Sequence, residues 1–295
     1  MSIGKLAFGD TIGIVNPSSV ANPETRAVEL RTLERLGFRV KMGANVYADT
    51  WGFVASDVER AGDFNAMVRD PEVKMVLFSG GEGSNELLPL IDYDTMRQSP
   101  KLYCSYSDGT SILNAIHAKT GMVVYYGQSP GVYGDLRQYD WSQFEAHFLR
   151  EHPGAYQKNS EWTALFPGCG EGYLIGGYTR NFALLQRSEY LTDHTGRQHI
   201  LFLEDHEHFS EVGEVNVYLA HIGQSPLMSS VKGLLFGHYS APQNAHLLQT
   251  LERFGKKHGI PVVYCDDFGH GTNHAILPIG ARVRLDADNR RMDFL

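Results

Sequence analysis

The first 125 or so residues alternate short apolar runs with amphipathic stretches, and this alternation sharply limits the possible folds. Strand patterns lie at 11–16, 38–43, 73–81, 102–108 and 122–127. The stretches between them carry helix signals, such as Asn22 as an N-cap before Pro23. Strands separated by helices form a mostly parallel sheet with both faces covered, and ligands bind at the carboxyl ends of its strands. We therefore expect an α/β lobe with its site at that edge.

One of these helices has a well-defined start. Ser56 and Glu59 have the spacing of a capping box, in which each side chain bonds to the backbone of the other residue. The helical period then predicts the residues that face the core, which are Val58, Ala61, Phe64 and Val68.

The second half of the chain has a different pattern. Strand patterns recur at 199–205, 231–238 and 260–267, and residues 281–295 have the pattern of a hairpin. Between the halves, an aromatic-rich segment lacks a clear period, and its composition favours a crossover and lid over a disordered linker. We expect an α/β lobe over 1–130, this crossover or lid over 131–168, and a smaller β-rich lobe over 169–295.

Composition narrows the classes of partner. The chain has 295 residues, a formal charge of −8 and no basic stripe, which argues against nucleic acid or an anionic membrane as a partner. No apolar run approaches the roughly 20 residues that span a bilayer, and the first residues do not resemble a signal peptide. The scattered Cys104, Cys169 and Cys265 fit a reducing compartment. We expect a cytoplasmic protein.

The segment "CSYSDGT" at 104–110 lies where a strand pattern gives way to a helix pattern. Ser107 at that corner would have its hydroxyl raised clear of the sheet, beside the N–H groups of the new helix. This geometry suits a nucleophile, because the positive end of a helix can receive an oxyanion. The spelling is close to a G-x-S-x-G nucleophile elbow, with Ser105 in place of the first glycine. Serine is also a common helix N-cap, and that interpretation competes.

A serine nucleophile needs a base, and the base needs a group that orients it. His270 follows a strand pattern within a glycine-flanked turn, where its side chain can project into a crevice. His274 and His238 are rivals for this role. Glu204 ends an apolar strand pattern and is the candidate acid, although a solvated strand end would also explain it.

The glycine-rich "SGGEGSN" at 79–85 has two interpretations. As a phosphate cradle it is weak, because it lacks the lysine and the spacing of known phosphate loops. As a tight turn it can bring backbone N–H groups close to a substrate oxygen. In that case the amides of Gly81 and Asp108 would form an oxyanion hole.

Metal binding is the less favoured chemistry. The segments "EDHEH" at 204–208 and "HGTNH" at 270–274 supply carboxylates and imidazoles at short spacing, as some zinc sites do. However, an i, i+4 histidine pair needs a helix, and the two glycines around His270 make a poor one. We expect no metal and no cofactor.

The sequence resembles the L,D-carboxypeptidase family of serine peptidases, which includes the microcin C self-immunity peptidases. The resemblance runs nearly end to end, through "GDTIGIVNPSS", "GGEGSNELLPLIDYDTMRQSPKLYCSYSDGTSILNAIHAKTG", "GEGYLIGGYTRNFALL", "ILFLED" and "FGHGTNHAILPIGARVRLDA". It implies a Rossmann-like N-terminal lobe, a β-rich C-terminal lobe, a site at their interface and a homodimer that needs no metal. It also implies a triad of Ser107, Glu204 and His270.

Three residues depart from the family pattern. Ser105 stands where the family has glycine, Gly109 where a β-branched residue is usual, and Tyr178 where an asparagine is usual. None of them removes a triad member, and they bear on the choice of substrate more than on activity.

The resemblance implies hydrolysis of the amide between an L-configured centre and a C-terminal D-amino acid, as in the murein tetrapeptide of peptidoglycan recycling. One alternative is hydrolysis of a microcin-like aminoacyl nucleotide or acyl-sulfamoyl adenosine. Another is an inactive homologue that only binds peptide or nucleotide. Candidates for substrate binding are Tyr178, Trp162, Arg180 and His238. Trp162 could stack on a nucleobase, or it could anchor its loop to the lobe interface.

Overall fold

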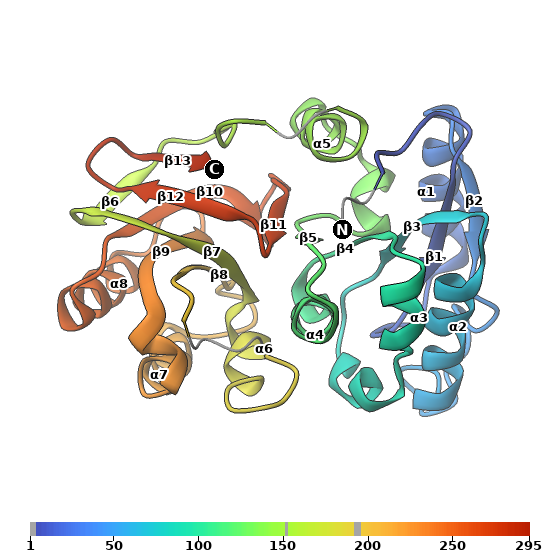
Figure 1. Cartoon of the computed structure of the whole chain (residues 1–295), viewed down its shortest axis with the longest axis horizontal. Coiled ribbons are helices and arrows are strands. Elements are labelled where there is room, and N and C mark those ends of the chain that lie inside the picture. The colour runs from blue at the N-terminus through green and yellow to red at the C-terminus, as the bar shows by residue number, and fades with distance from the viewer. Residues whose placement is uncertain (1–3, 151–152, 192–195) are drawn as a thin grey trace.

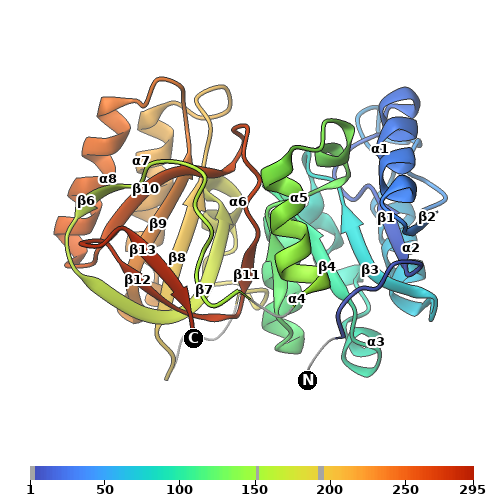
Figure 2. The same cartoon turned by 90° about the horizontal axis from the view of Figure 1, so that it is seen from above.

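The computed structural model of the chain describes residues 4–150, 153–191 and 196–295. Residues 1–3 of the amino-terminal stretch and residues 151–152 of the crossover segment lie outside the described residues. Figures 1 and 2 show two lobes side by side, with the N-terminal lobe in blue and green and the C-terminal lobe in yellow to red.

The N-terminal lobe is built on a six-stranded sheet with the order β11-β5-β4-β3-β1-β2. Its strands are β1 (Thr11–Val15), β2 (Arg39–Met42), β3 (Val73–Phe78), β4 (Leu102–Ser105), β5 (Val124–Tyr126) and β11 (Leu277–Ile279). The first five strands pair in parallel, as the alternating pattern predicts. Their carboxyl ends therefore lie along one edge of the sheet.

Four helices connect these strands, and they are α1 (Pro23–Arg35), α2 (Asp57–Arg69), α3 (Tyr93–Gln98) and α4 (Thr110–Thr120). The Asn22 side chain accepts hydrogen bonds from the amides of Glu24 and Thr25, so α1 begins at the predicted cap. The capping box of Ser56 and Glu59 is formed at the start of α2. α4 lies between the N-terminal sheet and the C-terminal lobe (Figure 2).

The predicted core face of α2 is wrong at one position. Ala61, Phe64 and Val68 are buried, but Val58 is 70% exposed. At about 100° per residue, Val58 projects roughly 120° away from Phe64 around the helix axis, so it falls outside the buried stripe.

The C-terminal lobe is built on a seven-stranded sheet with the order β13-β12-β7-β8-β9-β10-β6. Its strands are β6 (Thr163–Phe166), β7 (Cys169–Tyr178), β8 (His199–Glu204), β9 (Val231–His238), β10 (Val262–Gly269), β12 (Arg282–Asp286) and β13 (Arg291–Phe294). The four strands from β7 to β10 are parallel, and the other three join as antiparallel edges. The helices that alternate with the parallel strands are α6 (Thr179–Leu184), α7 (Val212–Gly223) and α8 (Ala245–His258).

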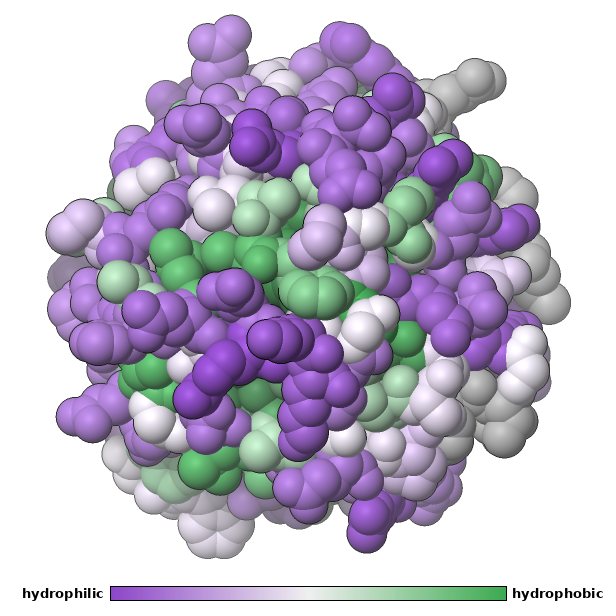
Figure 3. Space-filling view, turned by 90° about the vertical axis from the view of Figure 1, so that its left-hand side faces the viewer, coloured by the Kyte–Doolittle hydropathy of each residue, from purple (hydrophilic) through white to green (hydrophobic). Residues whose placement is uncertain are grey.

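The outer face of this lobe is mainly hydrophilic, with apolar surface visible between polar side chains (Figure 3). Helix α8 is typical of this arrangement, because Leu247, Leu251 and Phe254 point into the core. In the described part of the chain, no helix is both long and apolar enough to cross a membrane.

The two lobes share backbone and core. Strand β11 comes from the C-terminal half, yet it pairs with β5 and so completes the N-terminal sheet. One hydrophobic cluster contains residues of both sheets, such as Val76, Phe202 and Leu277. The Asn114 side chain on α4 also donates to the carbonyl of Gly176 on β7 at 2.8 Å. These contacts fix the position of one lobe relative to the other.

The segment 131–168 runs across the junction between the lobes. Helix α5 (Gln138–Phe144) continues into a wider turn at Glu145–Leu149. Asp140 and Gln143 on α5 accept hydrogen bonds from the amides of His274 and Ile276, at 2.9 and 3.1 Å. The segment therefore supports the stretch of chain that leads into β11.

Two valines on α2 test how burial sets stability. We expect Val68→Ala to lower the free energy of unfolding by about 2 kcal/mol, because it removes two methyl groups from a closed core. Val58→Ala removes the same atoms from an exposed position and should change it by less than about 0.5 kcal/mol. Denaturant unfolding of both variants measures the difference, and equal losses would contradict the buried face assigned to α2.

Candidate active site

Ser107 lies at a sharp corner between β4 and α4. A short 3-10 turn, Ser107–Gly109, joins the strand to the helix. The φ angle of Ser107 is 57°, a left-handed conformation that costs a residue with a side chain roughly 1–2 kcal/mol. Two hydrogen bonds hold it: its amide donates to the Tyr126 hydroxyl at 3.0 Å, and its carbonyl accepts from the Thr110 hydroxyl at 2.6 Å. Strained backbone of this kind is typical of functional sites.

His270 and Glu204 reach Ser107 from the other lobe. Glu204 is the last residue of β8, and His270 follows the end of β10. The imidazole Nε2 lies 2.8 Å from Ser107 Oγ, and Nδ1 lies 2.8 Å from Glu204 Oε2. The structure thus brings together three residues that are far apart in the sequence, in the order that a serine hydrolase uses.

The two rival histidines have other contacts. His238 pairs with Asp266, with Nδ1 2.7 Å from Oδ1. His274 packs edge-on against the Tyr106 ring, at 5.8 Å between centroids. Neither forms a hydrogen bond to Ser107 within the described residues, so His270 is the histidine in position to act as its base.

Tyr126 connects the nucleophile with the acid and was not identified from the sequence. Its fully buried hydroxyl donates to Glu204 Oε1 at 2.5 Å while it accepts the Ser107 amide. Together with His270, these contacts close a ring of hydrogen bonds across both lobes. In the sequence, Tyr126 can be recognised only as a tyrosine near the carboxyl end of a predicted parallel strand. The neighbouring Tyr125 fits the same description, so the pattern does not single out Tyr126.

Charge and burial act in opposite directions on His270. Burial lowers the pKa of the imidazole, but the charge of Glu204 and its hydrogen bond outweigh burial, so the pKa is raised above its usual value. Tyr106, Tyr178 and Phe209 surround the ring, with centroids 4.9 to 5.2 Å away. A base that is enclosed and paired in this way can hold a proton while a reaction proceeds.

Asp205 is a second acid beside this system. Burial, followed by the charge of Glu204, raises the pKa of Asp205 to about 7. Its carboxyl is fully buried, and its Oδ1 accepts the amide of His206 at 2.9 Å. Two adjacent acids therefore stand in different environments, and Glu204 is the one that contacts His270.

The glycine turn after β3 lies beside the Ser107 hydroxyl. Gly81 has φ 139°, and a side chain there would lie 2.0 Å from the carbonyl oxygen of Ser18. A side chain at Gly80 would lie 2.9 Å from Ser107 Cβ, so this turn passes directly beside the hydroxyl. We find no hydrogen bond from the amide of Gly81 or Asp108 to another described residue. These two amides are therefore the candidates for an oxyanion hole.

The side chain of Asp108 fixes the turn that carries its amide. One carboxyl oxygen accepts from the Ser84 amide at 2.9 Å, and the other accepts from the Asn181 side chain at 2.6 Å. Asn181 lies on α6 of the other lobe and was not identified from the sequence. No short motif marks it, because its role depends on the packing of α6 against α4.

Two of the three departures from the family pattern fit each other. The Ser105 hydroxyl donates to the carbonyl of Phe78 at 2.7 Å, behind the corner that carries Ser107. A side chain at Gly109 would lie 2.2 Å from that hydroxyl oxygen. Glycine at 109 therefore provides the space that serine at 105 occupies, so the corner keeps its shape.

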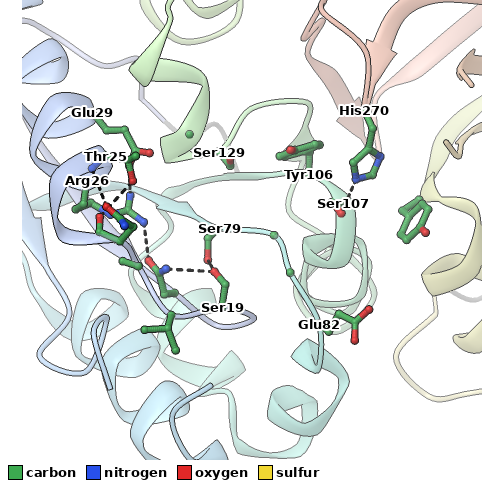
Figure 4. A pocket seen from close by; sticks show the side chains of 18 of the residues that line it. Ser19, Thr25, Arg26, Glu29, Ser79, Glu82, Tyr106, Ser107, Ser129 and His270 are labelled. Atoms are coloured by element: carbon green, nitrogen blue, oxygen red, sulfur yellow. Dashed lines mark hydrogen bonds and ion pairs between the residues drawn. The ribbon is translucent and has the colours of Figure 1, made fainter. Parts of the chain in front are cut away.

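Ser107 and His270 open into a cavity of about 700 Å³ (Figure 4). Of the proposed substrate-binding residues, Tyr178 and Arg180 line this cavity. Arg180 lies over the Tyr178 ring at 5.4 Å and 3.4 Å from Glu82. His208 and Phe209 also line it, and neither was identified as a binding residue from the sequence.

Trp162 and His238 are placed elsewhere. The Trp162 indole is 2% exposed, and its N–H donates to Asp267 at 2.8 Å. This contact anchors the extended segment before β6 to strand β10, and neither Trp162 nor His238 is among the residues that line the cavity. From 131–168, Gly131 is the one described residue that lines it. Among the described residues, no group of three or more histidine, cysteine or acidic side chains is arranged to hold a metal ion.

The sequence of the chain matches one known protein family over most of its length. Residues 12–127 match the family described as LD-carboxypeptidase N-terminal domain, and residues 171–285 match LD-carboxypeptidase C-terminal domain. The chain is 31% identical to the Bacillus subtilis (strain 168) protein named "Putative carboxypeptidase YocD", over 97% of this chain and 96% of that protein. It is 28% identical to the "Probable murein peptide carboxypeptidase" of the same strain, over 94% and 89% of the two chains.

A solved structure confirms the two-lobe fold. The crystal structure of an MccF-like protein from Bacillus anthracis str. Ames superimposes with a TM-score of 0.87 at 26% identity, covering 99% of this chain and 98% of that one.

The pKa of His270 gives a direct test of the pairing. Glu204→Gln removes the largest charge that raises this pKa and weakens the hydrogen bond to Nδ1, so we expect the pKa to fall. The measurement is NMR titration of the histidine side chains. Glu207→Gln is the control: it changes an exposed acid on the turn after β8 and should leave the pKa of His270 unchanged. An unchanged pKa in Glu204→Gln would contradict the pairing.

Proposed function

The chain belongs to the LD-carboxypeptidase family, and on this premise we propose that it is a serine carboxypeptidase acting on peptides of the murein tetrapeptide type. The bond cleaved is the amide between an L-configured centre and a C-terminal D-amino acid. The observation that carries the proposal is the continuous contact from Ser107 through His270 to Glu204, 2.8 Å at each hydrogen bond. The relative whose name refers to murein peptide supports the choice of substrate.

The first step forms a tetrahedral intermediate. His270 Nε2 accepts the proton of Ser107 as Oγ attacks the substrate carbonyl carbon. The Glu204 carboxylate keeps Nδ1 protonated and stabilises the imidazolium that forms. The amides of Gly81 and Asp108 donate to the developing oxyanion, and one such donor lowers the barrier by about 3–4 kcal/mol.

The second step releases the products. The imidazolium donates its proton to the leaving amine as the amide C–N bond breaks, which frees the C-terminal D-amino acid and leaves the acyl group on Ser107 as an ester. Water, deprotonated by His270, then attacks the ester carbonyl and restores the Ser107 hydroxyl. Arg180 lines the cavity beside Tyr178, which packs on His270. We place the terminal carboxylate of the substrate at Arg180 because a guanidinium binds a carboxylate well.

Hydrolysis of an aminoacyl nucleotide is the second candidate. The Tyr178 and Phe209 side chains line the cavity and offer aromatic surfaces on which a nucleobase could stack. The likeness to an MccF-like protein also favours it. Trp162, the residue first considered for stacking, is buried against Asp267 and does not carry this candidate. An inactive binding protein is the third candidate, and the intact contact of Ser107 with His270 argues against it.

We also propose a cytoplasmic homodimer. The cytoplasmic location follows from the sparse, unpaired cysteines, since Cys104, Cys169 and Cys265 are all free thiols. The dimer follows from the family resemblance.

Substitution of Ser107 tests the proposed function. The wild-type chain should release D-alanine from murein tetrapeptide and react with a serine-directed phosphonate. Ser107→Ala should lose both, with the fold intact by circular dichroism. Ser105→Ala removes a buried hydroxyl two residues away and should still be labelled, because Ser105 Oγ bonds to the Phe78 carbonyl instead of facing the cavity.

The same assay separates the alternatives. Preferred cleavage of an aminoacyl-sulfamoyl nucleoside over the tetrapeptide would replace the proposed substrate. Binding of either compound without turnover or labelling would show an inactive homologue. Full turnover in Ser107→Ala would refute the mechanism itself.

Tyr126→Phe tests the hydrogen bonds that join Ser107 to Glu204. We expect kcat to fall about tenfold with little change in KM, because roughly 1–1.5 kcal/mol of positioning is lost. Glu204 would pair more strongly with the imidazolium once it loses a donor, so the acid limb of kcat/KM should move to higher pH. Tyr103→Phe is the control, since the Tyr103 hydroxyl is buried without a hydrogen-bond partner among the described residues. Equal rates in the two variants would contradict the role of Tyr126.

A further inference from the structure

The cavity continues from Ser107 to a second polar end on helix α1. In Figure 4, His270 and Ser107 lie at one end, Ser19 and Ser79 in the middle, and Thr25, Arg26 and Glu29 at the other end. The mechanism proposed above uses none of the residues at the α1 end.

Arg26 and Glu29 are charged residues that the fold buries at this cavity. Arg26 is 5% exposed and Glu29 is 8% exposed, and both line the cavity wall. The Arg26 Nη1 atom lies 2.7 Å from Glu29 Oε2, yet the two groups are not aligned as a hydrogen bond. Arg26 Nε, Arg26 Nη1 and Glu29 Oε2 therefore have no hydrogen-bond partner among the described residues.

Such a pair is costly for the folded chain. Taking a guanidinium and a carboxylate out of water is compensated only when good geometry and further hydrogen bonds satisfy both groups. Burial accordingly lowers the pKa of Arg26 and raises that of Glu29. Charged groups kept at a cavity wall despite this cost are candidates for binding a ligand.

A hydrogen-bond network connects this end of the cavity with the catalytic end. Arg26 Nη2 donates to Asn16 at 2.8 Å, and the Asn16 amide donates to Ser19 at 3.3 Å. Ser19 in turn bonds to Ser79, which precedes the glycine turn beside Ser107. These hydrogen-bonded side chains line the cavity between its two ends and hold the Arg26 guanidinium in place.

The charges of the cavity are balanced at both ends. Arg26 faces Glu29 on α1, and Arg180 lies 3.4 Å from Glu82 near Ser107. A polyanion such as a phosphate chain would meet a carboxylate beside each guanidinium. An apolar group would leave the buried charges unsatisfied. A group that carries one positive and one negative charge can satisfy both members of a pair.

The orientation of the substrate decides which part reaches α1. The leaving amine must take its proton from His270, so the leaving D-amino acid lies on the His270 side of Ser107. The acyl portion would then extend in the opposite direction, toward the part of the cavity where Figure 4 shows Ser19, Ser79 and Arg26.

We propose that Arg26 and Glu29 form a subsite for a side chain of the acyl portion that ends in a free amino-acid centre, with an ammonium and a carboxylate on one carbon. The ligand carboxylate bonds to Arg26 and the ligand ammonium to Glu29. The pair exchanges its misaligned internal contact for these hydrogen bonds. This inference rests on the proposed peptidase function and names the feature of the peptide that the enzyme selects.

Two tetrapeptides of the form L-Ala-γ-D-Glu-X-D-Ala test the subsite. In one, X is meso-diaminopimelate, whose side chain ends in an ammonium and a carboxylate; in the other, X is L-lysine, which has the ammonium alone. The wild-type chain should cleave the first with a kcat/KM roughly 10- to 100-fold higher, as the loss of a charged hydrogen bond predicts. Because this ratio compares two substrates on one sample, it does not depend on the folded fraction.

Variants assign the preference to the pair. Arg26→Met should bring the ratio to one or below, because it removes the partner of the ligand carboxylate. The nearly isosteric Glu29→Gln should instead lower kcat/KM for both peptides, because both side chains end in the ammonium that Glu29 binds. Arg31→Met makes the same change as the first variant at an exposed position of the same helix and should keep the wild-type ratio. If the wild-type chain cleaves both peptides with similar kcat/KM, the peptidase proposal stands and the subsite proposal is overturned. An unchanged ratio in Arg26→Met, or an unchanged kcat/KM for both peptides in Glu29→Gln, would overturn the assignment to this pair.

A binding measurement tests the subsite even if the chain proves not to be a peptidase. If the wild-type chain cleaves neither peptide, calorimetry with the Ser107→Ala protein measures its affinity for the meso-diaminopimelate peptide. A loss of about tenfold or more on adding Arg26→Met, and none on adding Arg31→Met, would support the subsite in a protein that is not a peptidase. Equal affinities, or no binding, would overturn it.

Discussion

The site depends on a closed ring of hydrogen bonds that spans the two lobes. In the N-terminal lobe, Ser107 lies in the turn after β4 and Tyr126 is the last residue of β5. In the C-terminal lobe, Glu204 is the last residue of β8 and His270 directly follows β10. Each contact is short, so a shift of about 1 Å between the lobes would break the ring. The pairing of β11 with β5 prevents such a shift, because the chain that carries His270 is bonded into the other sheet within a few residues. The fold thus holds together groups that no local segment could align.

Much of this arrangement could be predicted from the sequence. The alternating pattern predicted the parallel sheet, and the rule that ligands bind at the carboxyl ends of strands predicted that Ser107 lies at the site edge. Glu204 and His270 were candidates with rivals, and the family resemblance selected them. Each of these residues follows or ends an apolar run, which is a local signal. Tyr126 and Asn181 carry no such signal, since each is defined by a partner in the opposite lobe. Val58 was placed wrongly because a valine near the start of a helix satisfies a loose apolar count without lying on the buried stripe.

The departures from the family pattern show the same limit. In the sequence, Ser105 and Gly109 are two separate changes beside the nucleophile. In the structure they are one change, because the hydroxyl of the first fills the space that a side chain at the second would need. The strained turn at Ser107 can therefore tolerate both together. Ser105 and Gly109 come into contact because the backbone turns sharply between them. The spacing of apolar residues in the sequence does not predict such a contact.

The charges of the cavity extend this argument from the nucleophile to the substrate. Arg26 and Glu29 lie in one of the amphipathic stretches of the N-terminal half, where charged side chains normally face solvent. The helix instead buries this pair, with only Leu33 as a fully enclosed apolar residue. A helix gains little stability from burying an imperfectly bonded ion pair, so packing does not explain the choice. Recognition of a zwitterionic group does explain it, because the unsatisfied atoms on α1 have complementary charges and face the cavity that contains Ser107.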